Sequence, residues 1–243
     1  MTAYHGGKQR IGLEVAQAIA DKCARLNVRT LAYIEPFCGM LGVFRRIPAL
    51  LDADAYFAGD QNESVIAMWR ALQRGTWKPP RDCSETRYIK LKRQRAPSAE
   101  RGYIGHQYSF GGSFFGAYRF NYIRPFDAGR ARQRVLDIAT TLKRVEFSAG
   151  GYEQFSGARD CVIYCDPPYD DTANNYLEKF DYPAFERWCV EMSKHNLVFV
   201  SSMKPVRGAE LLYSRDSATS YKGRMTTRSE KLYFIRRKLN FYK

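Results

Sequence analysis

The chain has 243 residues, enough for one large domain or for one domain with an insertion. Its net charge of +14 favours a polyanionic partner such as nucleic acid over a membrane surface, because no cationic amphipathic segment with a long apolar face is present. No apolar run approaches the roughly 18 residues of a membrane span, and the N-terminus lacks a signal-peptide pattern. We therefore expect a cytoplasmic protein with no membrane partner.

The six Cys residues lie in apolar or mixed settings and form no C-x-x-C pair. Cys161 and Cys165 fall on one predicted strand, so they cannot fold back into a chelate. Reduced thiols are typical of a cytoplasmic protein. We expect no metal site.

The first segment of chemical interest runs from Tyr4 to Arg10 and contains Gly6, Gly7 and Lys8. Paired glycines let backbone amides approach an anionic group, a helix start adds partial positive charge, and Lys8 could reach a carboxylate. A Gly-Gly pair before a helix is also common as a plain turn. Apolar residues at helical spacing predict the helix that follows: Ile11, Val15, Ala18, Ile19, Cys23 and Leu26.

Two apolar strands come next, each followed by candidate cofactor-binding residues. Residues 30–34 predict a strand that runs into a glycine-containing loop, Glu35 to Gly42, and then a helix, which is the order of a nucleotide-type cofactor loop. Residues 55–59 predict a second strand ending at Asp60. An acid there can accept hydrogen bonds from both ribose hydroxyls, and the alternative is that Asp60 caps the next helix.

Residues 71–146 are unusually basic, with 16 Lys and Arg residues against six acids. Such a charge run is often only a solvated face. Here aromatic residues are interleaved with it, and basic groups with aromatics suit phosphate contacts and base stacking. We predict a mostly helical insertion that holds DNA over the sheet. Its aromatic residues are Tyr108, Phe110, Phe114, Phe115, Tyr118, Phe120 and Tyr122.

The stretch with the most specific chemistry begins with a buried-looking strand, 161–165, and continues as Asp166-Pro167-Pro168-Tyr169. The prolines stop the strand because they lack an N–H for the ladder. The Asp166 carboxylate and the Pro167 carbonyl can accept two N–H bonds, while Tyr169 offers a stacking face. Together they suit a planar ring that bears an amino group. The alternative is a stiff turn with a surface Asp.

The remainder of the chain predicts more of the same sheet. Residues 145–148 and 197–200 predict strands, and Asp181 is a candidate cap for a helix that starts near Pro183. Residues 209–213 and 231–235 predict a terminal antiparallel pair. We expect the basic linker between these two strands to be a loop, either disordered or lying in a DNA groove.

Asp166 to Tyr169 after an apolar strand resembles the catalytic motif of the amino-methyltransferases that modify adenine N6 in DNA. Several other segments resemble Dam-type enzymes (alpha class, D12 family) in the same order. The resemblance implies contacts with S-adenosylmethionine for Tyr4, Lys8, Glu35, Phe37, Gly39, Asp60 and Asp166, and catalytic roles for Asp166, Pro167, Pro168 and Tyr169.

Arg119 and Asn121 match the family's Gly-x-x-Arg-x-Asn stretch beside its target-recognition domain. With Arg95, Tyr118 and Arg124 they are the candidate DNA contacts. The chain departs from the family at two places. Leu41 replaces a frequent second glycine of the cofactor loop, and Gly150-Gly151-Tyr152 stands where an acid near the cofactor adenine is common. Either Tyr152 or Phe155 could stack on the adenine instead.

The resemblance implies a Rossmann-like α/β fold with a seven-stranded mixed sheet, helices on both sides and a helical target-recognition insertion. Residues 1–70 and 147–243 would form the catalytic domain, and 71–146 the DNA-binding domain. The implied function is site-specific methylation of a flipped-out adenine in double-stranded DNA, in a bacterial or phage-infected cell. A restriction enzyme partner is compatible with this function.

Three alternatives remain open at the level of sequence. Cytosine-N4 transfer uses the same chemistry, although that family more often has Ser in place of Asp166. RNA adenine transfer is less favoured because the insertion is large and basic. The chain could also be a catalytically silent DNA-binding protein on the same fold, but it retains Lys8, Asp60, Asp166 and Tyr169 together.

Overall fold

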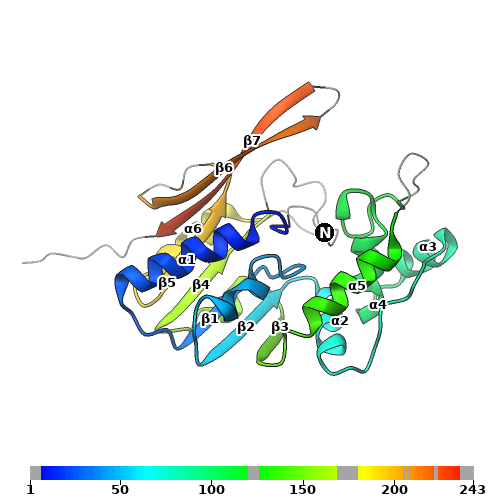
Figure 1. Cartoon of the computed structure of the whole chain (residues 1–243), viewed down its shortest axis with the longest axis horizontal. Coiled ribbons are helices and arrows are strands. Elements are labelled where there is room, and N and C mark those ends of the chain that lie inside the picture. Colours follow the sequence, from blue (N-terminus) through cyan, green and yellow to red (C-terminus); the bar gives the residue numbers. More distant parts are fainter. Residues whose placement is uncertain are drawn as a thin grey trace, which may run out of the picture.

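A computed structural model describes residues 7–119, 126–168, 180–204, 206, 208–221 and 224–235. Its centre is a seven-stranded sheet in the order β3-β2-β1-β4-β5-β7-β6 (Figure 1). Strands β1 to β5 are parallel, and β7 is antiparallel to both β5 and β6. The prediction of a seven-stranded mixed sheet is confirmed. The strands are β1 Ala32–Glu35, β2 Ala55–Asp60, β3 Val145–Ala149, β4 Cys161–Cys165, β5 Leu197–Ser202, β6 Glu210–Tyr221 and β7 Arg224–Ile235.

Both faces of the central strand β4 are buried, as its uncharged sequence predicts. Along β4, Val162 and Tyr164 point into one hydrophobic cluster, and Ile163 and Cys165 point into another. The first cluster is covered by α1 and α2, and the second by α6 and the short helix η3. The helices of the described chain are α1 Gly12–Leu26, η1 Phe44–Ala49, α2 Glu63–Gln73, α3 Glu85–Arg93, α4 Ala99–Gln107, η2 Phe110–Gly112, α5 Ala128–Ala139, η3 Tyr152–Phe155 and α6 Tyr182–Met192.

The cofactor-type loop is followed by a 3-10 helix, η1, and not by an α-helix. Pro48 lies inside η1 and cannot donate an i→i−4 hydrogen bond, so the α-helix that the strand–loop–helix order predicts does not form there. The predicted cap of α6 is confirmed, because the Asp181 side chain accepts a hydrogen bond from the Ala184 amide at 2.9 Å.

Between α2 and β3, the described part of the basic segment forms the helices α3, α4, η2 and α5, and its buried side chains join the core of the sheet. Tyr88, Tyr103 and Ile104 belong to the same hydrophobic cluster as α1 and α2. The contact between α2 and α4 is so close that a Cβ atom on Gly102 would lie 2.1 Å from the Ser64 carbonyl oxygen. The division of the chain into two domains therefore stays a prediction.

The terminal pair is much longer than the sequence predicts. The two strands pair from Glu210 opposite Phe234 out to Tyr221 opposite Arg224, and they project beyond the rest of the sheet (Figure 1). Most of the expected basic loop is therefore strand, which corrects that expectation. Its polar residues lack the apolar alternation by which a half-buried strand is recognised, although its Thr and Tyr residues favour extended backbone.

None of the helices in the described ranges is long and apolar enough to cross a membrane. All six Cys residues are buried free thiols.

Candidate active site

The candidate site lies at one edge of the sheet, where three parallel strands end. Glu35 ends β1, Asp60 ends β2 and Asp166 follows β4 directly. Since β1 pairs with both β2 and β4, these three acids are brought to the same edge. The carboxyl ends of parallel strands are where ligands bind in open α/β sheets.

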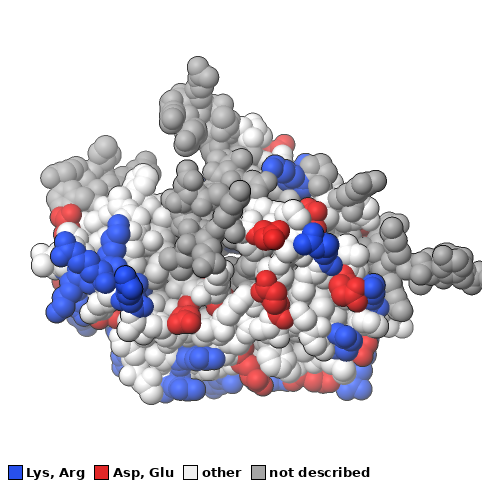
Figure 2. Space-filling model, turned by 180° about the vertical axis from the view of Figure 1, so that it is seen from behind, with Lys and Arg blue, Asp and Glu red and all other residues white. Residues whose placement is uncertain are grey.

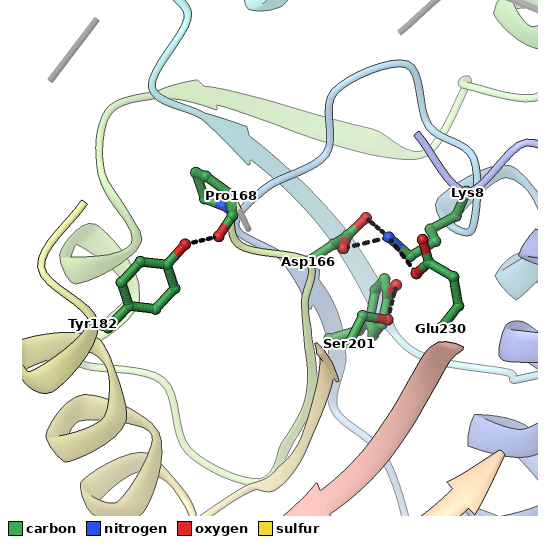
Figure 3. A network of polar contacts seen from close by, with 7 residues as sticks. Lys8, Asp166, Pro168, Tyr182, Ser201 and Glu230 are labelled. Carbon is green, nitrogen blue, oxygen red and sulfur yellow. Dashed lines mark hydrogen bonds and ion pairs between the residues drawn. The ribbon is translucent and has the colours of Figure 1, made fainter. Parts of the chain in front are cut away.

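Asp166 is held by Lys8, which comes from the segment before α1. The Lys8 ammonium contacts both carboxylate oxygens, at 2.6 Å and 2.9 Å (Figure 3). It also lies 3.3 Å from a carboxylate oxygen of Glu230, on β7. The Lys8 side chain is only 3% exposed, so an unpaired charge there would cost several kcal/mol, and two carboxylates surround it instead. The structure thus brings the candidate residues Lys8 and Asp166 together, and it adds Glu230, which sequence reasoning missed.

The turn after β4 is also held by a hydrogen bond from α6. The Tyr182 hydroxyl at the start of α6 donates a hydrogen bond to the Pro168 carbonyl (Figure 3). The Pro167 carbonyl, the second predicted acceptor, comes one residue earlier in the same turn. Tyr169 and Tyr4, the predicted aromatic contacts, lie outside the described residues.

Asp60 joins the ends of β1 and β2. One carboxylate oxygen accepts a hydrogen bond from the Gly39 amide at 2.9 Å, and the other accepts one from the Asn62 amide at 2.8 Å. The N-cap of α2 is Asn62, whose side chain accepts a hydrogen bond from the Ser64 amide. Asp60 is therefore not the helix cap, and this alternative is wrong. Each oxygen of Asp60 keeps a second lone pair with which it can bind a ligand hydroxyl.

The loop after β1 turns sharply at the predicted glycine. Gly39 has a φ of 43° and Leu41 a φ of 54°, so the backbone takes the left-handed form at both residues. The Trp69 indole of α2 donates a hydrogen bond to the Gly39 carbonyl at 2.8 Å. The departure at Leu41 thus leaves a tight turn in which a side chain occupies a conformation that glycine adopts more readily.

Glu35 is buried beneath the site. The Tyr33 hydroxyl donates a hydrogen bond to its carboxyl group at 3.0 Å. Burial raises the pKa of the Glu35 carboxyl well above its ordinary value, although the bond from Tyr33 lowers it. The shift favours the protonated form, in which the carboxyl can donate one hydrogen bond as well as accept one.

The two candidates for adenine stacking differ in their environment. Tyr152 is buried among the rings of the second cluster, whereas Phe155 is partly buried beside the end of β2. A Cβ atom on Gly59 would lie 2.7 Å from the Phe155 ring. Phe155 therefore packs against Gly59, the residue before Asp60. The rings around Tyr152 are Phe37, Phe180, Phe185 and Trp188, so the predicted cofactor residue Phe37 also packs into this cluster.

The predicted DNA contacts differ in their surroundings, and two of them lie outside the described residues. Arg95 is exposed after α3. The Tyr118 hydroxyl donates a hydrogen bond to the Cys83 carbonyl at 2.7 Å, so this residue also supports the local fold. The Arg119 guanidinium lies 4.7 Å from the centre of the Phe126 ring. Asn121 and Arg124 lie outside the described residues.

Positive charge gathers at one end of the molecule. Figure 2 shows Lys and Arg side chains clustered where α3 lies, with acidic residues spread over the middle of the same face. Lys90, Lys92 and Arg93 in the last turn of α3 are exposed. Nowhere in the described part of the chain are three or more His, Cys, Asp or Glu side chains placed to hold a metal ion.

Replacing Asp60 with asparagine is expected to change how stability depends on pH. Burial raises the pKa of the Asp60 carboxyl from 3.8 to about 6, against the two backbone amides that lower it. The folded state thus binds this proton more tightly than the unfolded chain, so the contribution of Asp60 to stability is present below about pH 4 and is lost as pH rises through about 6. A shift of this size corresponds to about 3 kcal/mol.

Urea unfolding of Asp60→Asn and of the wild type at about pH 4 and pH 7 tests this expectation. Between these two values the difference in unfolding free energy should move in favour of the variant by up to about 3 kcal/mol. Equal pH dependence in both proteins would show that Asp60 titrates normally.

No protein-family model matches the sequence, and no curated protein is significantly similar to it. Among solved structures, the chain is similar to a protein from Pyrococcus horikoshii described as a candidate RNA methyltransferase, with 10% identity, 93% of this chain and 89% of that chain covered, and a TM-score of 0.43. Precorrin-6y C5,15-methyltransferase from Geobacter metallireducens gives 9% identity, coverage of 91% and 86%, and a TM-score of 0.41. A candidate methyltransferase from Escherichia coli gives 11%, 92%, 86% and 0.40. At such low identities and TM-scores, these likenesses carry no functional argument.

Proposed function

We propose that this protein is an S-adenosylmethionine-dependent methyltransferase that modifies the exocyclic N6 amino group of adenine in double-stranded DNA. The observation that supports the proposal best is the position of Asp166. Its carboxylate follows the central strand β4 directly, is paired with Lys8, and lies at the same sheet edge as Glu35 and Asp60. Asp166 thus lies at the carboxyl ends of the parallel strands, where open α/β sheets bind their ligands.

The chemistry of the groups at this edge fits the methyl donor. Asp60 has lone pairs left for ribose hydroxyls, and Phe155, which packs against the preceding Gly59, would offer a surface for a purine ring. Glu35 and the loop around Gly39 are polar groups that the methionine part of the donor could reach. When bound, the donor supplies a methyl group on a positively charged sulfur.

The chain's own residues would then prepare the acceptor amine. The lone pair of adenine N6 is delocalised into the ring, so the amine is a poor nucleophile. The Asp166 carboxylate and the Pro167 carbonyl would accept its two N–H bonds, which favours a pyramidal nitrogen with the lone pair aimed at the methyl group. Such alignment can supply up to about 7–11 kcal/mol. Tyr169 would stack on the base.

A base inside a duplex must be flipped out to reach this edge, which costs a few kcal/mol. The basic face that includes α3 and Arg95 would offset this cost through phosphate contacts. Binding that depends on such contacts weakens as salt concentration rises. A polyanion such as DNA is thus the partner that the charge distribution favours.

The decisive experiment identifies the methylated nucleoside. The protein is incubated with isotope-labelled S-adenosylmethionine and unmethylated DNA in one reaction, and with the same donor and RNA in another. The nucleic acids are then digested to nucleosides. We expect labelled N6-methyladenine from DNA. Labelled N4-methylcytosine would show that the substrate is cytosine instead of adenine. Label in RNA alone would show that the substrate is RNA instead of DNA. No label together with no donor binding by calorimetry would overturn the methyltransferase assignment and favour a silent DNA-binding protein.

A further inference from the structure

Glu230 is a third member of the charged cluster at the site. It reaches the Lys8 ammonium at 3.3 Å from the side opposite Asp166 (Figure 3). Its side chain is 25% exposed, against 16% for Asp166. Glu230 comes from the last strand of the chain, whereas the turn that contains Asp166 follows β4. A single buried ammonium thus connects two carboxylates from separate parts of the sheet.

The position of Glu230 is fixed by the base of the β6–β7 hairpin. Lys22 of α1 pairs with Glu210 of β6 at 2.8 Å, and Glu14 of α1 pairs with Arg215 of β6 at 3.0 Å. Arg215 lies directly opposite Glu230 in the strand register. Two ion pairs therefore dock the hairpin on α1, the helix that follows Lys8. The two ion pairs therefore hold the strand that carries Glu230 close to the segment that carries Lys8.

The net charge of the cluster matters for methyl transfer to an amine. The nitrogen lone pair forms the new N–C bond, the C–S electron pair stays on sulfur, and the nitrogen then loses a proton to Asp166 or to water. Positive charge therefore develops on the nitrogen beside Asp166. Lys8 and Asp166 together are neutral, and they cannot offset this charge well. Glu230 balances the charge of the Lys8 ammonium, so that the Asp166 carboxylate can offset the positive charge that develops on the nitrogen.

Glu230 also gives Lys8 a second acceptor. In the structure the ammonium bonds both oxygens of Asp166, the group that must accept N–H bonds from the substrate. An ammonium shared with Glu230 can release one Asp166 oxygen without being left unpaired in a buried position. Asp166 can then turn toward the amine while Lys8 stays in place.

We propose that Glu230 is a positioning residue for the transfer step, which acts through Lys8 by balancing its charge and by holding it while Asp166 engages the amine. This inference rests on the proposed methyltransferase function. It goes beyond that function because it makes the C-terminal hairpin part of the catalytic machinery. The role requires a carboxylate at this position, and a neutral side chain of the same shape does not suffice.

The test compares Glu230→Gln, Glu230→Asp, Lys8→Met and the double variant with the wild type. We expect Glu230→Gln to lower kcat by about 10- to 100-fold, with the donor Kd from calorimetry changed less than about twofold, because the loss falls on the transition state. Glu230→Asp should regain part of the rate. The double variant should be no slower than Lys8→Met alone, because Glu230 acts through Lys8.

Glu100→Gln is the matched control. Glu100 lies on α4, pairs with Arg87 of α3 and has a side chain that is 27% exposed, close to the 25% of Glu230. We expect this control to retain the wild-type kcat. Three outcomes would overturn the role of Glu230 and leave the proposed function standing. They are an equal loss of kcat in both Gln variants, a wild-type kcat in Glu230→Gln, and a double variant with a lower kcat than Lys8→Met. A wild type with neither transfer nor donor binding would overturn both.

Discussion

Asp166→Ala is expected to abolish methyl transfer, with a loss of at least about 10³-fold in kcat, or about 4 kcal/mol of transition-state stabilisation. The variant removes the charged acceptor of the amine and leaves only the Pro167 carbonyl. We expect the fold to survive, because Glu230 remains as a partner for the buried Lys8 ammonium. Isotope transfer under single-turnover conditions measures the chemical step directly.

Two measurements separate this loss from a loss of binding. Asp166→Ala should still bind DNA, because the basic face at α3 is distant in the chain and unchanged. Asp166→Asn is the matched variant, which keeps the size of the side chain but loses its charge. Its kcat should also be at least about 10²-fold lower than that of the wild type. Transfer by Asp166→Ala at the wild-type rate would refute the assigned role.

Gly12→Ala is expected to destabilise the fold by about 3 kcal/mol, at the upper end of the usual cost of overpacking. A Cβ atom on Gly12 would lie 2.2 Å from the Gly42 carbonyl oxygen, and Gly42 itself sits against the backbone of Lys8. Alanine would favour the helix by at most about 1 kcal/mol. The clash outweighs this gain, because its partner is backbone that cannot rotate away. The start of α1, the cofactor-type loop and Lys8 would have to move apart.

Chemical denaturation measures this change, and donor binding should weaken with it. Gly157→Ala is the control, since a Cβ atom there meets no heavy atom within 4 Å. Its stability should stay within about 0.5 kcal/mol of the wild type. If Gly12→Ala were as stable as Gly157→Ala, α1 would not dock on the loop as described.

The parts of the fold that the sequence predicts well have a strong local pattern. The helix from Gly12 has a clear apolar face, and strand Cys161–Cys165 is an uncharged run ended by two prolines. The acids at the ends of β1, β2 and β4 follow from the same reasoning, because parallel strands present their carboxyl ends at one edge. The antiparallel pairing of 209–213 with 231–235 was also predicted, but its extension to Tyr221 and Arg224 was missed because the outer part of the hairpin carries no apolar alternation.

The sequence by itself determined the strands, the acid placed directly after β4, and the concentration of positive charge between residues 71 and 146. Only the tertiary structure decided that Glu230 shares Lys8 with Asp166, that Asp60 ties the loop at Gly39 instead of capping α2, and that the basic helices share one core with the sheet. The reason is physical. Hydrophobic periodicity and the effect of proline and glycine act over a few neighbouring residues. The pairing of Lys8 with Asp166 spans 158 positions and depends on the order of the strands in the sheet.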